Sequence, residues 1–61
     1  MLNEIYENEF DNLATLSFSE GVGWFVDLGS QLWNRYYGRR SDAVRYLTKI
    51  GYVFKEYETE K

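Results

Sequence analysis

The most restrictive feature of this chain is that its 61 residues include neither cysteine nor histidine. Without cysteine there is no disulfide framework and no thiolate metal site. A chain this short buries only about 60% of its unfolded surface, so its core needs large side chains or a partner. Aromatic residues make up 20% of the sequence, and each buried ring removes roughly 150–250 Å² from water. We therefore expect one small folded domain over residues 1–61.

The first segment, residues 2–16, has the spacing of an amphipathic helix. Its apolar residues recur at intervals of three and four, which places them on one helical face. They are Leu2, Ile5, Tyr6, Phe10, Leu13 and Leu16. Glu4, Glu7 and Asp11 then share the opposite face. Glu9 falls among the apolar residues, where a carboxylate needs water or a cationic partner.

Residues 20–37 show the clearest helical pattern in the chain. At about 100° per residue, one wide arc holds all the apolar side chains, namely Val22, Trp24, Phe25, Val26, Leu28, Leu32, Trp33, Tyr36 and Tyr37. Ser19 is the predicted N-cap, and Gly38 is the predicted end of the helix. Each internal glycine costs such a helix about 0.8–1 kcal/mol. The alternative is a break at Gly29, with a second helix starting at Ser30.

The C-terminal part is predicted to hold a third helix and a strand. Ser41 is the predicted cap of a helix over residues 42–50, which ends at Gly51. Residues 52–58 are rich in strand formers. Their partner is either residues 13–18 or a second chain. The sequence therefore predicts a mainly α fold, a three-helix small domain with a short C-terminal β-strand.

Charge divides the chain into two parts. Residues 1–34 contain six acids and no base, whereas residues 35–61 contain seven bases and four acids, for a net charge of −3. The acidic face formed by Glu4, Glu7 and Asp11 is either a solvated helix face or a contact surface for a basic partner. A hard cation needs oxygens that converge from a loop, which a straight helix does not provide. We therefore predict no metal site.

The basic residues are predicted to gather around the turn between the second and third helices. They are Arg35, Arg39, Arg40, Arg45 and Lys49. They either pair with the acidic first helix or contact an acidic or phosphate-bearing partner. An aromatic and basic edge, made of Trp33, Tyr36, Tyr37, Arg39 and Arg40, is the second predicted partner-binding surface. Tryptophan, tyrosine and arginine are enriched at binding hot spots, so this edge is expected to form a dimer or partner interface.

The order helix, Gly51, strand over residues 43–53 resembles the junction between recognition helix and wing in winged-helix DNA-binding proteins. The connection Gly38–Ser41 also has the length of a helix-turn-helix turn. The resemblance implies nucleic-acid contacts from Arg45, Thr48 and Lys49, and the turn would add Arg39 and Arg40. An acidic net charge is the opposite of what DNA-binding domains usually carry.

The sequence offers little for catalysis. No nucleophile paired with a base, phosphate-cradling glycine motif or metal-ligand spacing is present, so neither an enzyme nor a cofactor is expected. The leading hypothesis is a small acidic protein-binding inhibitor or adaptor, of the kind encoded by phages and mobile elements. Anti-CRISPR proteins are one example. Its partner would be a protein, including a nucleic-acid-binding protein or complex, or a second copy. The alternative is a helix-turn-helix or winged-helix-like DNA-binding regulator.

No segment resembles a signal peptide, and none approaches the roughly 20 apolar residues that a membrane span needs. The sequence therefore predicts a cytoplasmic protein without a membrane partner.

Overall fold

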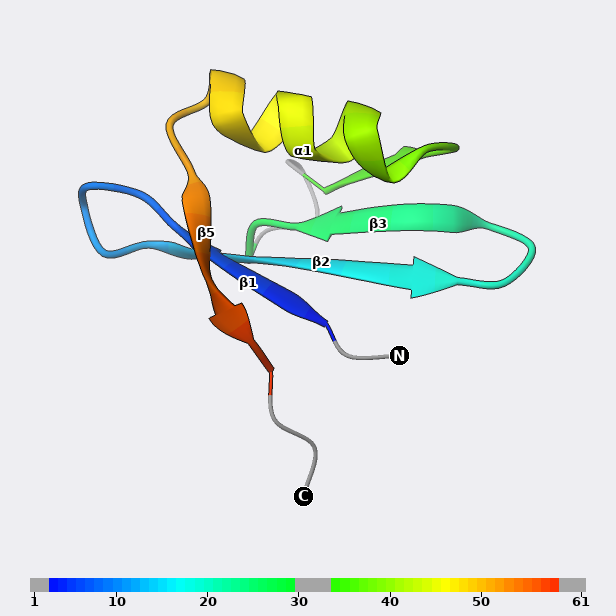
Figure 1. Ribbon diagram of the computed structural model, residues 1–61, viewed down its shortest axis with the longest axis horizontal. Helices are drawn as coiled ribbons and strands as arrows, with labels where there is room; N and C mark the ends of the chain where they lie inside the picture. Colours follow the sequence, from blue (N-terminus) through cyan, green and yellow to red (C-terminus); the bar gives the residue numbers. More distant parts are fainter. Residues whose placement is uncertain (1–2, 30–33, 59–61) are drawn as a thin grey trace.

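The computed structural model describes residues 3–29 and 34–58, which form one antiparallel sheet and one helix. The elements are β1 (Glu4–Glu7), β2 (Leu13–Ser19), β3 (Gly23–Asp27), β4 (Arg35–Tyr37), α1 (Arg40–Lys49) and β5 (Val53–Tyr57). The strand order across the sheet is β4-β3-β2-β1-β5. The chain therefore winds through β1 to β4, and α1 then crosses one face of the sheet to place β5 beside β1 (Figure 1).

The prediction of a mainly α, three-helix domain is wrong. Residues 2–16 contain β1, a turn and the start of β2, and residues 20–37 contain a turn, β3 and β4. Gly21 and Gly23 have φ angles of 83° and 110°, which an α-helix does not admit. The alternative helix from Ser30 is also wrong where the structure describes it, because β4 begins at Arg35. The glycines that we counted as a cost to a helix are the positions that reverse the chain.

The turn between β1 and β2 is organised by Asn8. Its side-chain oxygen accepts hydrogen bonds from the backbone N–H groups of Phe10 and Asn12, both at 3.0 Å. Asp11 adopts a left-handed φ of 63°, which asparagine and aspartate tolerate better than most residues. Phe10 is therefore exposed at a turn, not packed on a helical face, and Glu9 also lies in solvent.

The last helix and strand lie close to their predicted positions. The helix starts at Arg40, so Arg39 is its N-cap and Ser41 lies inside the first turn. Gly51, with a φ of 93°, ends it in a Schellman motif. In this motif the N–H of Gly51 bonds to the carbonyl of Thr48, and the N–H of Tyr52 bonds to the carbonyl of Leu47. Residues 13–18 do form a strand, but the partner of β5 is β1, so the predicted pairing is wrong.

The core lies between α1 and one face of the sheet. Its buried members are Tyr6, Ala14, Leu16, Val26, Ala43, Leu47 and Tyr52. Strand alternation places Ala14 and Leu16 on this face, and the spacing of Ala43 and Leu47 matches one helical turn. One carboxylate, that of Glu4, is buried on the same face.

Candidate functional site

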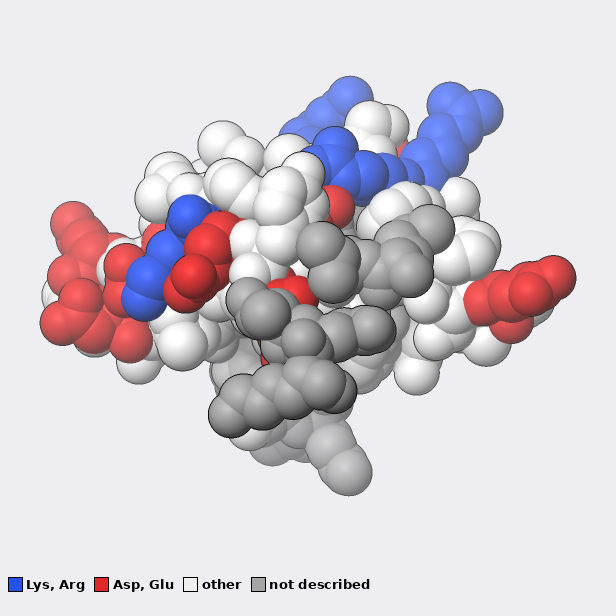
Figure 2. Space-filling model, turned by 60° about the horizontal axis from the view of Figure 1, so that its bottom comes forward, with Lys and Arg blue, Asp and Glu red and all other residues white. Residues whose placement is uncertain are grey.

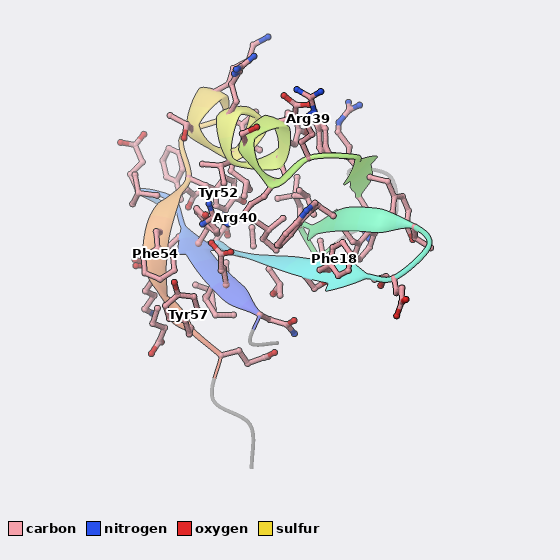
Figure 3. The ribbon with its side chains drawn as sticks, turned by 45° about the vertical axis from the view of Figure 1, so that its right-hand side comes forward. Phe18, Arg39, Arg40, Tyr52, Phe54 and Tyr57 are labelled. Carbon is pink, nitrogen blue, oxygen red and sulfur yellow. The ribbon has the colours of Figure 1, made fainter. Side chains whose placement is uncertain are left out.

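A groove runs between α1 and β5, at one edge of the sheet. Its volume is about 390 Å³, and it is lined by Tyr6, Arg40, Val44, Thr48, Tyr52, Val53, Phe54 and Tyr57. Figure 3 shows Arg40, Tyr52 and Phe54 close together between the helix and the strand. The lining is mostly aromatic and aliphatic, and Arg40 is its one charged residue. Sites of this size and character are typical of ligand-binding surfaces.

Strand β5 forms one wall of the groove and is the last strand of the sheet. It pairs with β1 on one side, and no strand in the described chain covers its other side. Val53, Phe54 and Tyr57 are 66%, 47% and 55% exposed. A register shift opposite Ile5 and Tyr6 interrupts the ladder, and the rings of Phe54 and Tyr57 lie 5.1 Å apart between centroids. The edge therefore combines unpaired backbone groups with a cluster of exposed apolar side chains.

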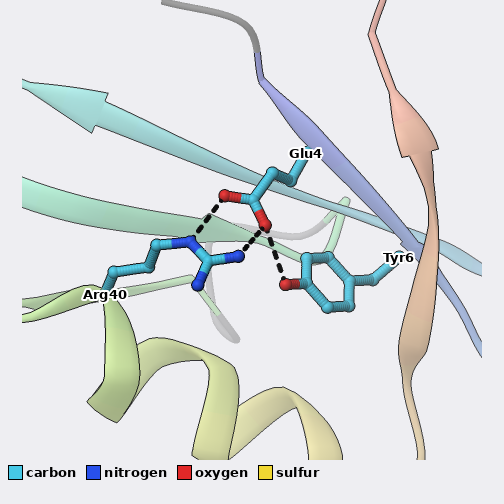
Figure 4. A network of polar contacts seen from close by, with 3 residues as sticks. All are labelled: Glu4, Tyr6 and Arg40. Carbon is cyan, nitrogen blue, oxygen red and sulfur yellow. Dashed lines mark hydrogen bonds and ion pairs between the residues drawn. The ribbon is translucent and has the colours of Figure 1, made fainter.

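A buried polar network forms the floor of the groove. Arg40 donates two hydrogen bonds to Glu4, from Nε to Oε2 at 2.8 Å and from Nη2 to Oε1 at 2.6 Å. The hydroxyl of Tyr6 donates a third to Oε1 at 3.0 Å (Figure 4). The Glu4 side chain is 7% exposed, whereas that of Arg40 is 49% exposed. The carboxylate therefore fixes an arginine whose other side remains open to the groove.

Burial and this network shift the pKa values of its members. Hydrogen bonding from Arg40 lowers the pKa of Glu4 below 4.5, although desolvation opposes this change. Desolvation, followed by the hydrogen bond to Glu4, raises the pKa of Tyr6 from 10.0 to about 12. The hydrogen bonds to Glu4 also raise the pKa of Arg40. Near neutral pH, Glu4 therefore stays ionised, Arg40 stays protonated and Tyr6 keeps its hydroxyl proton.

The raised pKa of Tyr6 predicts a loss of stability at high pH. A group whose pKa is higher in the folded state stabilises the protein fully below its unfolded pKa, here about 10, and that contribution is lost as the pH rises through about 12. We expect the free energy of unfolding to fall by about 2 kcal/mol between these values because of Tyr6. Chemical denaturation of the wild type and of Tyr6→Phe, measured between pH 8 and 12, tests this. Equal pH slopes for the two proteins would contradict it.

The predicted acidic face does not exist as one surface. Glu4 points into the core and binds Arg40. Glu7 lies on the opposite face of the strand, 3.6 Å from the Lys55 ammonium. Asp11 lies in the turn that follows. In a strand, successive residues lie on opposite faces. Residues three apart, such as Glu4 and Glu7, share a face in a helix but lie on opposite faces of the sheet. The acidic and basic parts of the sequence do meet inside the fold, but at Glu4 and not at Glu9.

The predicted aromatic and basic edge is also divided. Trp33 lies outside the described residues. Tyr36 is exposed, its ring 4.7 Å from that of Phe25 on the sheet face away from α1. Tyr37 faces the helix and packs near Tyr46. Arg39 begins α1, while Arg40 is bound to Glu4.

All the residues predicted to contact nucleic acid lie on α1 except its N-cap Arg39, but the described residues do not form the predicted helix-turn-helix arrangement. The segment Gly38–Ser41 joins strand β4 to α1, so it does not connect two helices. Arg45, Thr48 and Lys49 are exposed on α1. They do not form one set, because Thr48 lines the groove beside β5 while Arg45 and Lys49 line a hollow beside β4.

The sequence interpretation missed most of the groove. Val53, Phe54 and Tyr57 were recognised as strand formers but not as binding residues, and Val44 and Tyr52 were assigned no role at the surface. The available signal was the unpaired strand itself, because a C-terminal strand at a sheet edge leaves its outer side open.

Neither a metal centre nor a membrane span is found in the described part of the chain. Within residues 3–29 and 34–58, no three acidic side chains are grouped closely enough to hold a metal ion. The helix that the structure describes is too short and too polar to cross a membrane. Comparisons with known proteins found no matching family model, no matching curated protein and no matching solved structure.

Proposed function

We propose that this protein is a non-enzymatic protein-binding protein that holds an extended segment of its partner against β5. The observation that supports this most strongly is the juxtaposition of an open sheet edge and an apolar groove. Peptides are often recognised by addition to a sheet edge, where backbone hydrogen bonds give affinity and neighbouring pockets give specificity. Here the edge is β5, and the groove beside it lies under α1.

The groove indicates the chemistry of the bound segment. Apolar and aromatic side chains make up most of its wall, so a large apolar side chain of the partner would fill it. Arg40 adds hydrogen-bond donors, although its charge is already paired with Glu4. Its Nη1 nitrogen makes no hydrogen bond with a residue that the structure describes, because Glu4 is bound through Nε and Nη2. A carboxylate next to the apolar anchor would complement it. The proposed ligand is therefore an extended segment with a large apolar residue and an adjacent carboxylate.

This mode of action needs no catalytic group. A small protein that occupies its partner's segment acts as an inhibitor or an adaptor by occupancy alone. An anti-CRISPR protein, the example given in the sequence analysis, would be one inhibitor of this kind. Strand addition also accounts for the exposed apolar residues on β5, which a protein without a partner would have reason to cover.

Selection from a library of random twelve-residue peptides tests the proposal. We expect enriched peptides to share a large apolar residue next to an acidic residue. They should shift the backbone NMR signals of residues 52–58 and of the α1 side that carries Val44 and Thr48. Thr48→Arg should weaken this binding at least tenfold, because the exposed Thr48 lines the groove and a larger side chain fills it. Ser41→Arg is the matched control, since Ser41 is exposed on the same helix outside the groove.

Three results would contradict the proposal. The first is that no peptide is enriched, and the second is that the enriched peptides bind Thr48→Arg as well as they bind the wild type. The third is that light scattering shows a dimer, that Thr48→Arg and the peptides leave this dimer intact, and that the NMR signals of β5 report pairing with a second copy. The last result would assign the edge to self-association.

A further inference from the structure

A second hollow lies on the other side of α1, towards β4. Its volume is about 330 Å³, and it is lined by Tyr37, Asp42, Arg45, Tyr46 and Lys49. The four helical residues recur at intervals of three, one and three, so they share one face of α1. Tyr37 reaches the same hollow from β4. No lining residue is shared with the groove beside β5.

Stacked side chains support this second hollow. The guanidinium carbon of Arg35 lies 5.1 Å from the centre of the Tyr46 ring. The rings of Tyr37 and Tyr46 lie 5.9 Å apart between centroids, inclined by 36°. The exposed guanidinium of Arg35 is thus held beside Tyr46 by a cation–π contact. No acid in the described residues pairs with it, so its charge remains available to a carboxylate.

The cations around this hollow are not paired with acids in the described residues. Arg35, Arg39, Arg45 and Lys49 form no ion pair with an acid in the described residues, whereas Arg40 and Lys55 pair with Glu4 and Glu7. Asp42 is the one acid that lines the hollow. These five residues carry a net charge of +3, so the rest of the chain, with its overall −3, carries −6. Figure 2 shows most of the visible basic side chains at the top and most of the acidic ones at the two ends, with one basic side chain among the acids on the left.

We propose that this basic α1–β4 surface, defined by Arg35, Tyr37, Arg39, Arg45, Tyr46 and Lys49, binds a carboxylate-rich segment of a partner protein. Arginine presents a fork that matches a carboxylate, and tyrosine adds contact area at low entropic cost. Binding here does not depend on the groove beside β5, because the two sites lie on opposite sides of α1. The same partner could engage both, or each site could act alone.

The charge distribution favours a short acidic segment over nucleic acid. Helix α1 has ten residues and is about 15 Å long. Duplex DNA carries a charge about every 1.7 Å along its axis and continues past a surface of this length. Its phosphates would then approach the acidic turns that carry Glu9, Asp11 and Glu20. A protein segment can confine its carboxylates to the length of the helix.

An NMR titration tests the inference. The probe is an eight-residue peptide of alternating glutamate and aspartate, added to the ¹⁵N-labelled full chain at low ionic strength. We expect shifts at the amides of β4 and of the Arg45 and Lys49 turn of α1, with affinity that falls as salt is added. The double variant Arg45→Gln, Lys49→Gln should bind about tenfold more weakly. Lys55→Gln is the matched control, because it removes a cation paired elsewhere.

The outcomes separate clearly. No shift at low ionic strength, or equal binding by the double variant, overturns the inference. Tighter binding of a duplex oligonucleotide than of the acidic peptide at the same amides also overturns it, in favour of nucleic acid. Arg45 and Lys49 are exposed, so circular dichroism should show that the double variant folds. Thr48→Arg should not weaken acidic-peptide binding, because it removes no cation and adds one beside Lys49, so a failure here is distinguishable from a failure of the groove proposal.

Discussion

Replacement of Arg40 by alanine is expected to destabilise the protein by about 2–3 kcal/mol. The substitution leaves the Glu4 carboxylate buried without its cation, and such a loss costs about 3–5 kcal/mol when both partners are fully buried. We expect less here, because the Arg40 side chain is half exposed and water can reach the site. A chain of this length has a total stability of only about 3–9 kcal/mol. Urea denaturation at pH 7 should therefore show a much lower midpoint.

Two further variants give this prediction its controls. Lys55→Ala removes a lysine ammonium from a partly exposed pair at 3.6 Å, and it should cost less than about 0.5 kcal/mol. Adding Glu4→Gln to Arg40→Ala should restore part of the lost stability, since a neutral amide replaces the unpaired charge. If Arg40→Ala costs no more than Lys55→Ala, the Glu4–Arg40 pair does not stabilise the fold.

Replacement of Gly23 by alanine is expected to cost about 2–3 kcal/mol. Gly23 begins β3 with a φ of 110°, and an added Cβ would lie 2.6 Å from the carbonyl oxygen of Tyr37. The substitution therefore strains the backbone and also pushes β4 away from β3. Thermal unfolding followed by circular dichroism measures the loss. The NMR signals of β4 should move more than those of β1.

Gly21→Ala is the matched substitution for this test. Gly21 lies two residues earlier, with a φ of 83°, and an added Cβ there meets no atom within 4 Å. It should cost only about 1 kcal/mol, the penalty for a left-handed alanine. Equal losses for the two alanine variants would show that the contact between β3 and β4 does not limit stability.

The sequence interpretation succeeded where local signals were sufficient. Helix α1 is bounded by a glycine in a Schellman motif and has its buried residues at helical spacing, so it was found to within two residues at its start and one at its end. Strand β5 was found because β-branched and aromatic residues dominate residues 52–58. Both elements follow from the properties of neighbouring residues.

The rest failed because apolar residues recur densely in the first half of the chain. Where more than one residue in three is apolar, the apolar positions fit both the helical period of 3.6 residues and the strand period of 2 residues. Two local signals favoured strands and turns over helices here. They are the glycines at 21 and 23 and the turn from Asn8 to Asn12. The unpaired strand over residues 52–58 was a signal for an open sheet edge, but the groove beside it could not be predicted, since it depends on β5 pairing with β1, a contact between residues about 50 positions apart.

That long-range pairing has a consequence for the energetics of recognition. Strand β1 supplies the buried carboxylate, α1 the guanidinium and β5 the exposed edge, so the groove exists only when both ends of the chain are joined in one sheet. A partner that binds the groove therefore binds only the folded chain, and its binding shifts the folding equilibrium towards the folded state. At a hundred times its dissociation constant such a ligand adds about 2.7 kcal/mol of stability. For a domain this small, the bound partner would supply the additional stability that disulfides and metals provide in other mini-proteins.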